Sequence, residues 1–173
     1  MLASPNSKPK TAAIPPNSSD DSSHATPPAA TLQRITAAIA ASELRHTGEI
    51  CFAVDAALPM RAIMAGTTAR DRANETFARL GVWDTRANNG VLLYLLLADH
   101  RIEIVADRGF DGLVSDAQWR GACQLVEERL RAGEPEAAVL TGIQALSDII
   151  AAHFPDDPDS VDHDELPNVP HIL

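Results

Sequence analysis

The sequence predicts an α/β fold, a three-layer α/β/α sandwich around a small mixed sheet. One observation behind this prediction is a run of large apolar residues at 91–97, bounded by Asn-Asn-Gly on one side and Asp99-His100 on the other. Such a run is typical of a strand buried on both faces. The other observation is the order of segments, which reads helix, strand, helix, strand, strand, helix, helix from their hydrophobic spacing. The strand at 91–97 should lie at the centre of the sheet.

The composition favours a single acidic domain. The chain has 173 residues, of which 45% are hydrophobic, and this is enough for one ordinary core. Its formal net charge of -10, with no cluster of Lys and Arg after residue 34, argues against nucleic acid as a partner and favours cations. Cys51 and Cys123 lack the short spacing of zinc or redox motifs, so we expect two buried free thiols.

The two ends of the chain differ in composition from the domain between them, which we place at residues 31–155. Residues 1–30 are rich in Ser, Pro, Asn, Thr and Ala and are expected to be disordered. They contain no apolar run long enough for a signal-peptide core or a membrane span, so we expect no direct membrane span and a cytoplasmic location. Residues 156–173 form an acidic, Pro-containing tail whose apolar end could pack back on the domain.

Four helices are expected around the strands. Apolar residues at helical spacing predict a first helix at about 31–45, with Gly48 as a plausible stop before the strand at 50–54 and a loop containing Pro59. Two capping boxes and a proline mark the starts of the other three helices. These are Thr68 with Asp71 for a helix at 68–81, Ser115 with Gln118 for a helix ending at Gly133, and Pro135 for a last helix ending at Pro155.

The connections between strands fix their expected directions. A strand, a helix and a buried strand in succession form a right-handed crossover, so the first two strands should run parallel. Only Asp99 and His100 separate the second strand from a third at 102–106, which suggests a tight antiparallel hairpin. Regular pairing about that turn would place Leu92 opposite Asp107 and Gly90 opposite Gly109.

This connectivity gathers polar side chains from three junctions at one edge of the sheet. Carboxylate and amide oxygens on loops suit Ca²⁺ or Mg²⁺, whereas a helix N-terminus beside Arg108 could instead receive a phosphate oxygen. The residues expected there are Glu43, His46 and Glu49 from the first junction, Asp84, Asn88 and Asn89 from the second, and Asp107, Arg108, Asp111 and Asp116 from the third.

Each of these residues also has a purely structural interpretation. Asp116 can satisfy backbone donors at a helix start, and the Asn-Asn-Gly segment can be turn chemistry. His46 can stabilise a helix end, Glu49 can be a solvated edge residue, and Asp107 can pair with Arg108. The interpretation as a site depends on the convergence of the three junctions.

Several segments together resemble the TPM-domain family, a phosphatase-like domain of thylakoid-lumen, photosystem II repair and bacterial proteins. They are Ser42-Glu43 with His46, Gly48-Glu49-Ile50, Arg72-Ala73 with Phe77, Val82-Trp83-Asp84-Thr85, Asn88-Asn89-Gly90-Val91-Leu92 and Val105-Ala106-Asp107-Arg108-Gly109. The resemblance covers roughly residues 31–155, and the ends Phe154-Pro155 and Asp164-Glu165-Leu166-Pro167 look like a compact, single-domain bacterial branch. It implies an α/β/α sandwich, divalent-cation binding and, for some members, phosphatase activity or an accessory role for membrane complexes.

Two functions from different classes therefore stay open. One is a non-catalytic cation-binding module that docks a protein partner, which could be membrane-associated; we favour it because no side chain is an obvious activated nucleophile. The other is a metal-dependent phosphatase acting on phosphomonoesters, with His46 or Glu49 as acid or base. In both, the predicted ligands of Ca²⁺ or Mg²⁺ are Asp84, Asn88, Asn89, Asp107 and Asp111.

Overall fold

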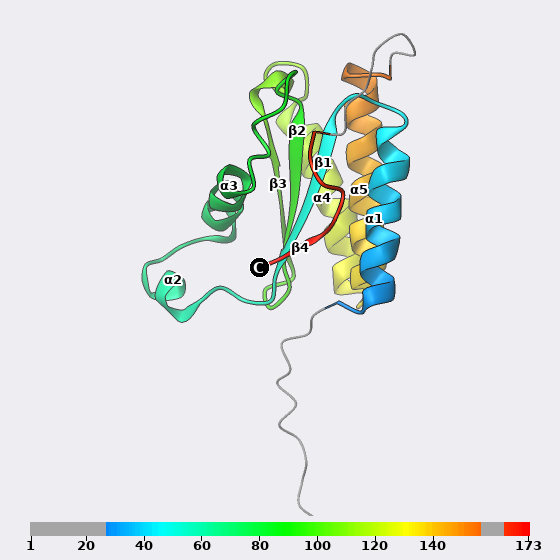
Figure 1. Ribbon diagram of the computed structural model, residues 1–173. Coiled ribbons are helices and arrows are strands. Elements are labelled where there is room, and N and C mark those ends of the chain that lie inside the picture. Colours follow the sequence, from blue (N-terminus) through cyan, green and yellow to red (C-terminus); the bar gives the residue numbers. More distant parts are fainter. Residues whose placement is uncertain (1–26, 157–164) are drawn as a thin grey trace, which may run out of the picture.

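The computed structural model describes residues 27–156 and 165–173, which form a sandwich of three layers (Figure 1). The disorder predicted for residues 1–30 and the acidic part of the predicted tail therefore fall largely outside the described residues. The elements are α1 (Ala29–Glu43), β1 (Glu49–Asp55), α2 (Met60–Met64), α3 (Ala69–Arg79), β2 (Gly90–Leu96), β3 (Arg101–Ala106), the 3-10 turn η1 (Arg108–Phe110), α4 (Asp116–Arg131), α5 (Pro135–His153) and β4 (His171–Ile172).

The sheet has the strand order β3-β2-β1-β4 and is mixed, as the sequence predicts. β1 and β2 run parallel, from Glu49 opposite Gly90 to Asp55 opposite Leu96, and β3 runs antiparallel to β2. Every residue of β1 and β2 is buried, because both strands have neighbours on both sides and helices on both faces. The apolar run at 91–97 is therefore central, as expected.

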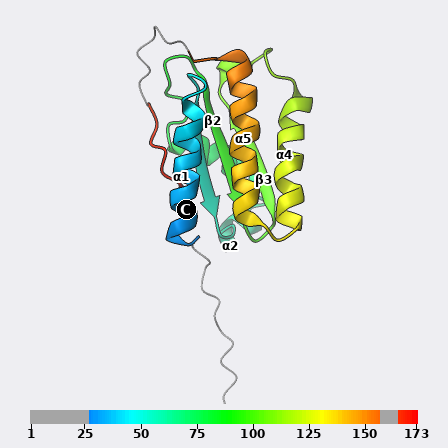
Figure 2. The ribbon, with the colours of Figure 1, turned by 90° about the vertical axis from the view of Figure 1, so that its right-hand side faces the viewer.

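Alternate residues of the strands point to opposite faces of the sheet and contribute to two separate cores. On one face, Phe52 and Leu93 pack with α1, α4 and α5, which lie side by side over the sheet in Figure 2. On the other face, Ala53 and Tyr94 pack against Ala73 of α3, so the second helical layer is thinner. The three-layer prediction is confirmed.

The pairing register of the hairpin differs from the one predicted. Leu92 lies opposite Val105, not Asp107, because the turn takes four residues, Leu97–His100, instead of two. The backbone N–H groups of Leu97 and Ala98 donate to carbonyls at the end of β1, which removes these residues from the hairpin ladder. His100 then adopts a positive φ of 48°. The shift is two residues, so each side chain keeps the face that the sequence predicts.

Both predicted capping boxes are present. The Thr68 hydroxyl accepts from the Asp71 N–H, and the Ser115 hydroxyl accepts from the Gln118 N–H, with the reciprocal bonds formed in each case. Gly133 has a positive φ of 76° directly after α4, as a helix stop requires.

Gly48, by contrast, does not end α1, which stops at Glu43. A Cβ at Gly48 would lie 2.5 Å from Cγ2 of Ile150, so glycine is needed there for close packing against α5.

Besides the 3-10 turn η1, two short elements of the structure are not predicted from the sequence. The loop containing Pro59 holds the helix α2, none of whose residues is buried. The end of the tail forms β4, in which His171 and Ile172 pair with Ala53 and Val54 of β1. The tail does pack back on the domain within residues 165–173, where Leu166 is buried.

Candidate functional site

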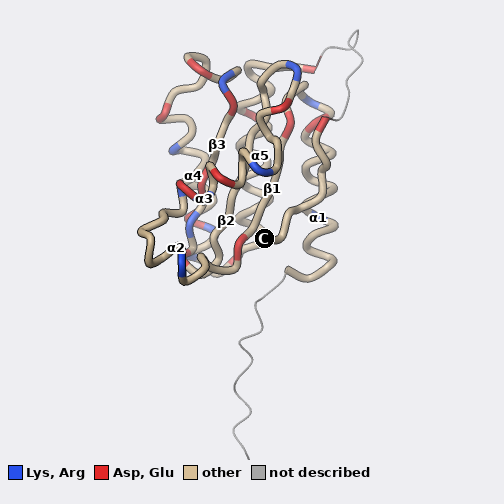
Figure 3. The backbone as a smooth tube through the Cα atoms, turned by 60° about the vertical axis from the view of Figure 1, so that its left-hand side comes forward, with Lys and Arg blue, Asp and Glu red and all other residues tan. Residues whose placement is uncertain are grey.

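The three polar junctions do meet at one end of the sheet. The starts of the parallel strands β1 and β2, the end of the antiparallel β3 and the start of α4 all lie at that end. It is the upper end of the molecule in Figure 1, and Figure 3 shows acidic and basic positions along its loops. Apart from Glu43, whose carboxylate accepts the Ile50 N–H at 3.4 Å, and the exposed Asp84, the predicted residues separate there into three groups with different surroundings.

The first group, Glu49, Asn89 and His46, is buried in contacts within the chain. The carboxylate of Glu49 accepts the backbone N–H groups of Glu165 at 3.1 Å and Leu166 at 3.4 Å, so it holds the tail against β1. The Asn89 side-chain amide donates to the Thr47 carbonyl at 2.8 Å, and the backbone carbonyl of Asn89 accepts the Glu49 N–H at 3.3 Å. His46 is fully buried where the chain forms a bridge to Pro155. These side chains connect the first two junctions to the tail and to α5.

The second group joins the loop before β2 to the loop after β3. Asn88 has a positive φ of 53°, its carbonyl accepts the Gly109 N–H at 2.8 Å, and its Oδ1 accepts Nε of Arg108 at 2.9 Å. The guanidinium of Arg108 therefore contacts Asn88 and forms no ion pair with Asp107, whose Oδ1 accepts the Arg108 backbone N–H at 2.7 Å. The predicted contact between the two loops is present.

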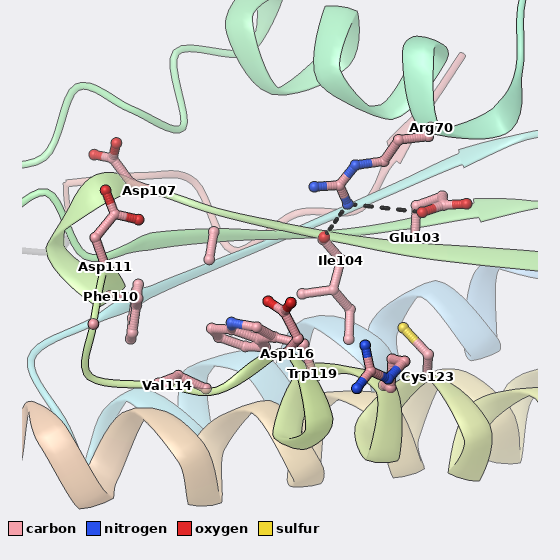
Figure 4. A pocket seen from close by; sticks show the side chains of 13 residues that line it. Arg70, Glu103, Ile104, Asp107, Phe110, Asp111, Val114, Asp116, Trp119 and Cys123 are labelled. Carbon is pink, nitrogen blue, oxygen red and sulfur yellow. Dashed lines mark hydrogen bonds and ion pairs between the residues drawn. The ribbon is translucent and has the colours of Figure 1, made fainter.

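The third group consists of acidic side chains, which line a cavity of about 480 Å³ beside β3. Figure 4 shows Asp107 and Asp111 at one end of this cavity and Asp116, from the first turn of α4, pointing into it. Asp84, by contrast, is exposed in the turn after α3 and does not line the cavity. The structure thus brings Asp107 and Asp111 together with Asp116 and leaves Asp84 outside.

The other end of the cavity carries side chains that the sequence does not mark as candidates. Arg70, from the first turn of α3, donates to the Ile104 carbonyl at the free edge of β3 and lies 3.7 Å from a carboxylate oxygen of Glu103 (Figure 4). Trp119, Arg120 and Cys123 come from α4. No local pattern marks these residues, because α3 and α4 approach β3 from opposite layers only in the folded chain.

The thiols are poorly suited to nucleophilic chemistry. Burial raises the pKa of Cys51 to about 12, and burial followed by repulsion from Glu103 and Glu127 raises the pKa of Cys123 to about 11. Neither forms a disulfide. Cys51 is buried as predicted, and Cys123 is only half-buried because it lines the cavity. Thiolate is the reactive form, so both are unreactive near neutral pH.

Asp107 has the most distinctive surroundings in the cavity. Its Oδ1 caps η1, whereas its Oδ2 is buried and has no hydrogen-bond partner within residues 27–156 and 165–173. No ion pair to Asp107, Asp111 or Asp116 is present in that same part of the chain. Across the described residues there is also no cluster of three or more His, Cys, Asp and Glu side chains arranged to hold a metal. A cation at Asp107 would need further oxygens from amides, backbone or water.

The opposite end of the sheet is closed by a buried network. One carboxylate oxygen of Asp55, at the end of β1, accepts the Tyr94 hydroxyl at 2.8 Å and Nε of Arg72 at 2.8 Å. Burial, and then the bond to Asp55, holds the pKa of Tyr94 well above its usual value. These polar groups satisfy one another, so the network is structural.

The chain belongs to the TPM-domain family, whose sequence profile matches residues 28–149. Among solved structures, nine chains match it. The BA42 protein of the psychrophilic bacterium Bizionia argentinensis is 27% identical, with a TM-score of 0.74 over 84% of this chain and 94% of that one. The N-terminal domain of a P. gingivalis protein, 19% identical, has a TM-score of 0.59 over 76% of this chain and 81% of that one, and is similar in fold. No curated protein matches the chain.

No helix in the described part of the chain combines the length and the apolar character that crossing a membrane requires.

Proposed function

We propose that this TPM domain is a divalent-cation-binding module, with the ion at the acidic end of the cavity and Asp107 and Asp111 as its anionic ligands. The observation that carries the proposal is the buried Oδ2 of Asp107, which lacks a hydrogen-bond partner among the described residues. Removing a carboxylate oxygen from water without a replacement contact is costly. A cation supplies that contact and also offsets the repulsion among Asp107, Asp111 and Asp116.

The chemistry of the donors selects the ion. Carboxylate oxygens prefer Ca²⁺ and Mg²⁺, and Mg²⁺ in particular keeps several waters when a protein supplies only one or two carboxylates. Of the other predicted ligands, Asn88 does not line the cavity, but its loop is bonded to Arg108 and Gly109 next to Asp107. Asp84 and Asn89 lie apart from the lining of the cavity. An ion at Asp107 would hold the loops around residues 88 and 109 in one arrangement, and we propose that a protein partner contacts this loop surface.

We favour binding over catalysis because of what lines the cavity. Its described lining includes no Ser, Thr, His or Lys, and its one thiol, Cys123, has a pKa raised to about 11. His46 and Glu49, the predicted acid and base, are buried away from it in contacts with Pro155 and the tail.

One observation favours the alternative, a metal-dependent phosphatase. Arg70 and Arg120 line the same cavity as the carboxylates, and guanidinium groups bind phosphoryl oxygens well. A phosphomonoester could then bridge a cation at Asp107 and an arginine at the other end.

Cation binding is tested by following the melting temperature while Ca²⁺ or Mg²⁺ is titrated. The ion should stabilise the protein by about 2.7 kcal/mol at a hundredfold excess over its dissociation constant. D107N keeps an oxygen that can cap η1 but removes the charge, so it should abolish most of this gain. The matched control is D99N, because Asp99 is an exposed aspartate in the turn at the other end of the sheet. Equal stabilisation of D107N and the wild type would refute the proposal.

Catalysis is tested with p-nitrophenyl phosphate, with and without millimolar Mg²⁺. If the domain is a non-catalytic cation-binding module, we expect no metal-dependent turnover. Turnover that requires Mg²⁺ and is lost in both D107N and R120Q would establish the phosphatase instead. The two assays are independent, so a protein that binds the ion without turning over substrate supports the module alone.

A further inference from the structure

The helix α2 exposes its large apolar side chains instead of burying them. Met60, Ile63 and Met64 are 70%, 55% and 82% exposed, and their i, i+3, i+4 spacing places them on one face of the helix. The small Ala62 is the half-buried residue of α2. A surface helix of a soluble domain normally turns its apolar side inward. In α2 this arrangement is reversed.

The shape and charge of this segment restrict what could cover it. Figure 1 shows α2 projecting from the sandwich on the side of α3. The chain from Ala56 to Arg70 contains no carboxylate and carries Arg61 on α2 itself. Asp55, which precedes it, is buried against Tyr94 and Arg72. An apolar face beside one cation, with no acidic group to desolvate, is the composition of a segment that enters the interfacial region of a bilayer.

We propose that α2 inserts Met60, Ile63 and Met64 into the surface of a zwitterionic lipid bilayer, with Arg61 at the level of the lipid phosphates. A second copy of the chain is less suitable, because a specific interface takes about 20–30 residues a side and α2 offers three apolar ones. A lipid surface needs no complementary groove. The net charge of -10 makes a zwitterionic surface a better match than an anionic one, which would repel the rest of the molecule.

The full-length chain and sucrose-loaded vesicles of phosphatidylcholine test this in a sedimentation assay. We expect weak, reversible binding, below the partition constant of about 10⁴ M⁻¹ for a single myristoyl chain. M60Q/I63Q/M64Q should lower the partition constant about tenfold or more, since burying even one such side chain is worth about that factor. Gln is a good helix former and no residue of α2 is buried, so the variant should keep the wild-type melting temperature.

The control variant is L44Q, because Leu44 is 79% exposed after α1, at the other end of the molecule. It should bind vesicles like the wild type. Equal binding by the wild type and the triple variant would refute the proposal, and so would no binding at millimolar lipid or binding that requires an anionic lipid. Concentration-dependent dimerisation that the triple variant abolishes, without vesicle binding, would assign the patch to a second copy. If the protein stays monomeric and does not bind vesicles, the proposal is also refuted, and a different protein is then the remaining candidate to cover the patch.

Discussion

Gly109 is the residue that lets the two loops of the candidate site meet. A Cβ built on Gly109 would lie 2.4 Å from the carbonyl oxygen of Asn88 and 2.8 Å from that of Ala87. Both contacts are with backbone, which cannot move aside as the end of a side chain can. The hydrogen bond from the Gly109 N–H to Asn88 depends on this close approach.

Replacing Gly109 with alanine should therefore destabilise the protein by about 1–3 kcal/mol, the usual cost of overpacking. It should also weaken any cation response, because the loops would separate. Gly121, in the middle of α4 with nothing within 4 Å of a built Cβ, provides the matched control. G121A should stabilise by about 0.5–1 kcal/mol. Urea unfolding of the two variants measures both effects, and a G109A protein as stable as the wild type would show that the loops adjust freely.

At the scale of elements, α1 and α5 are joined by an exposed cluster of polar side chains. Arg34 donates to both carboxylate oxygens of Glu136, and the Thr31 hydroxyl donates to the same carboxylate. The bond from Arg34, and then that from Thr31, lowers the pKa of Glu136 to about 2. The cluster ties the first helix to the start of the last one, where both lie over the same face of the sheet.

The sign of this shift sets a pH dependence. A folded-state pKa below the ordinary value means that the contribution of Glu136 to stability is present above about pH 4.5 and is lost as the pH falls toward 2. E136Q should therefore melt below the wild type at pH 6, and the difference should shrink steadily between pH 4.5 and 2. Glu128, exposed on α4 and without an ion pair among the described residues, gives the control E128Q. A difference that stays constant across that range would contradict the assignment.

At the scale of the whole molecule, the sequence predicts what its periodicity encodes. The apolar run at 91–97 predicts a central strand because only such a strand is buried on both faces, and the capping boxes at Thr68 and Ser115 locate two helix starts correctly. α2 and β4 are too short for a periodic pattern. β4 is defined by its pairing with Ala53 and Val54 of β1, which are distant in the sequence. The hairpin register was wrong because Leu97 and Ala98 bond to the end of β1, a contact that no local sequence signal reveals.

In the candidate site, too, some features follow from the sequence pattern and others depend on contacts made only in the folded chain. The meeting of the loops at Asn88 and Gly109 follows from strand direction and could be predicted. The surroundings of each side chain on those loops could not be predicted. Glu49 and Asn89 are buried in contacts with the tail and Thr47, whereas Asp107 lies at one end of the cavity. Arg70 was missed because it reaches the cavity from the opposite layer.

The most direct test of cation binding at Asp107 is the response of the backbone amide NMR signals to Ca²⁺ or Mg²⁺ in the full chain. If the ion binds at Asp107, we expect the largest saturable shifts at residues 107–112, smaller ones at Asn88 across the Gly109 hydrogen bond, and none at Asp99. In D107N the shifts at 107–112 should no longer saturate at millimolar ion. Shifts confined to the acidic tail, or a response at 107–112 that D107N leaves intact, would contradict cation binding at Asp107.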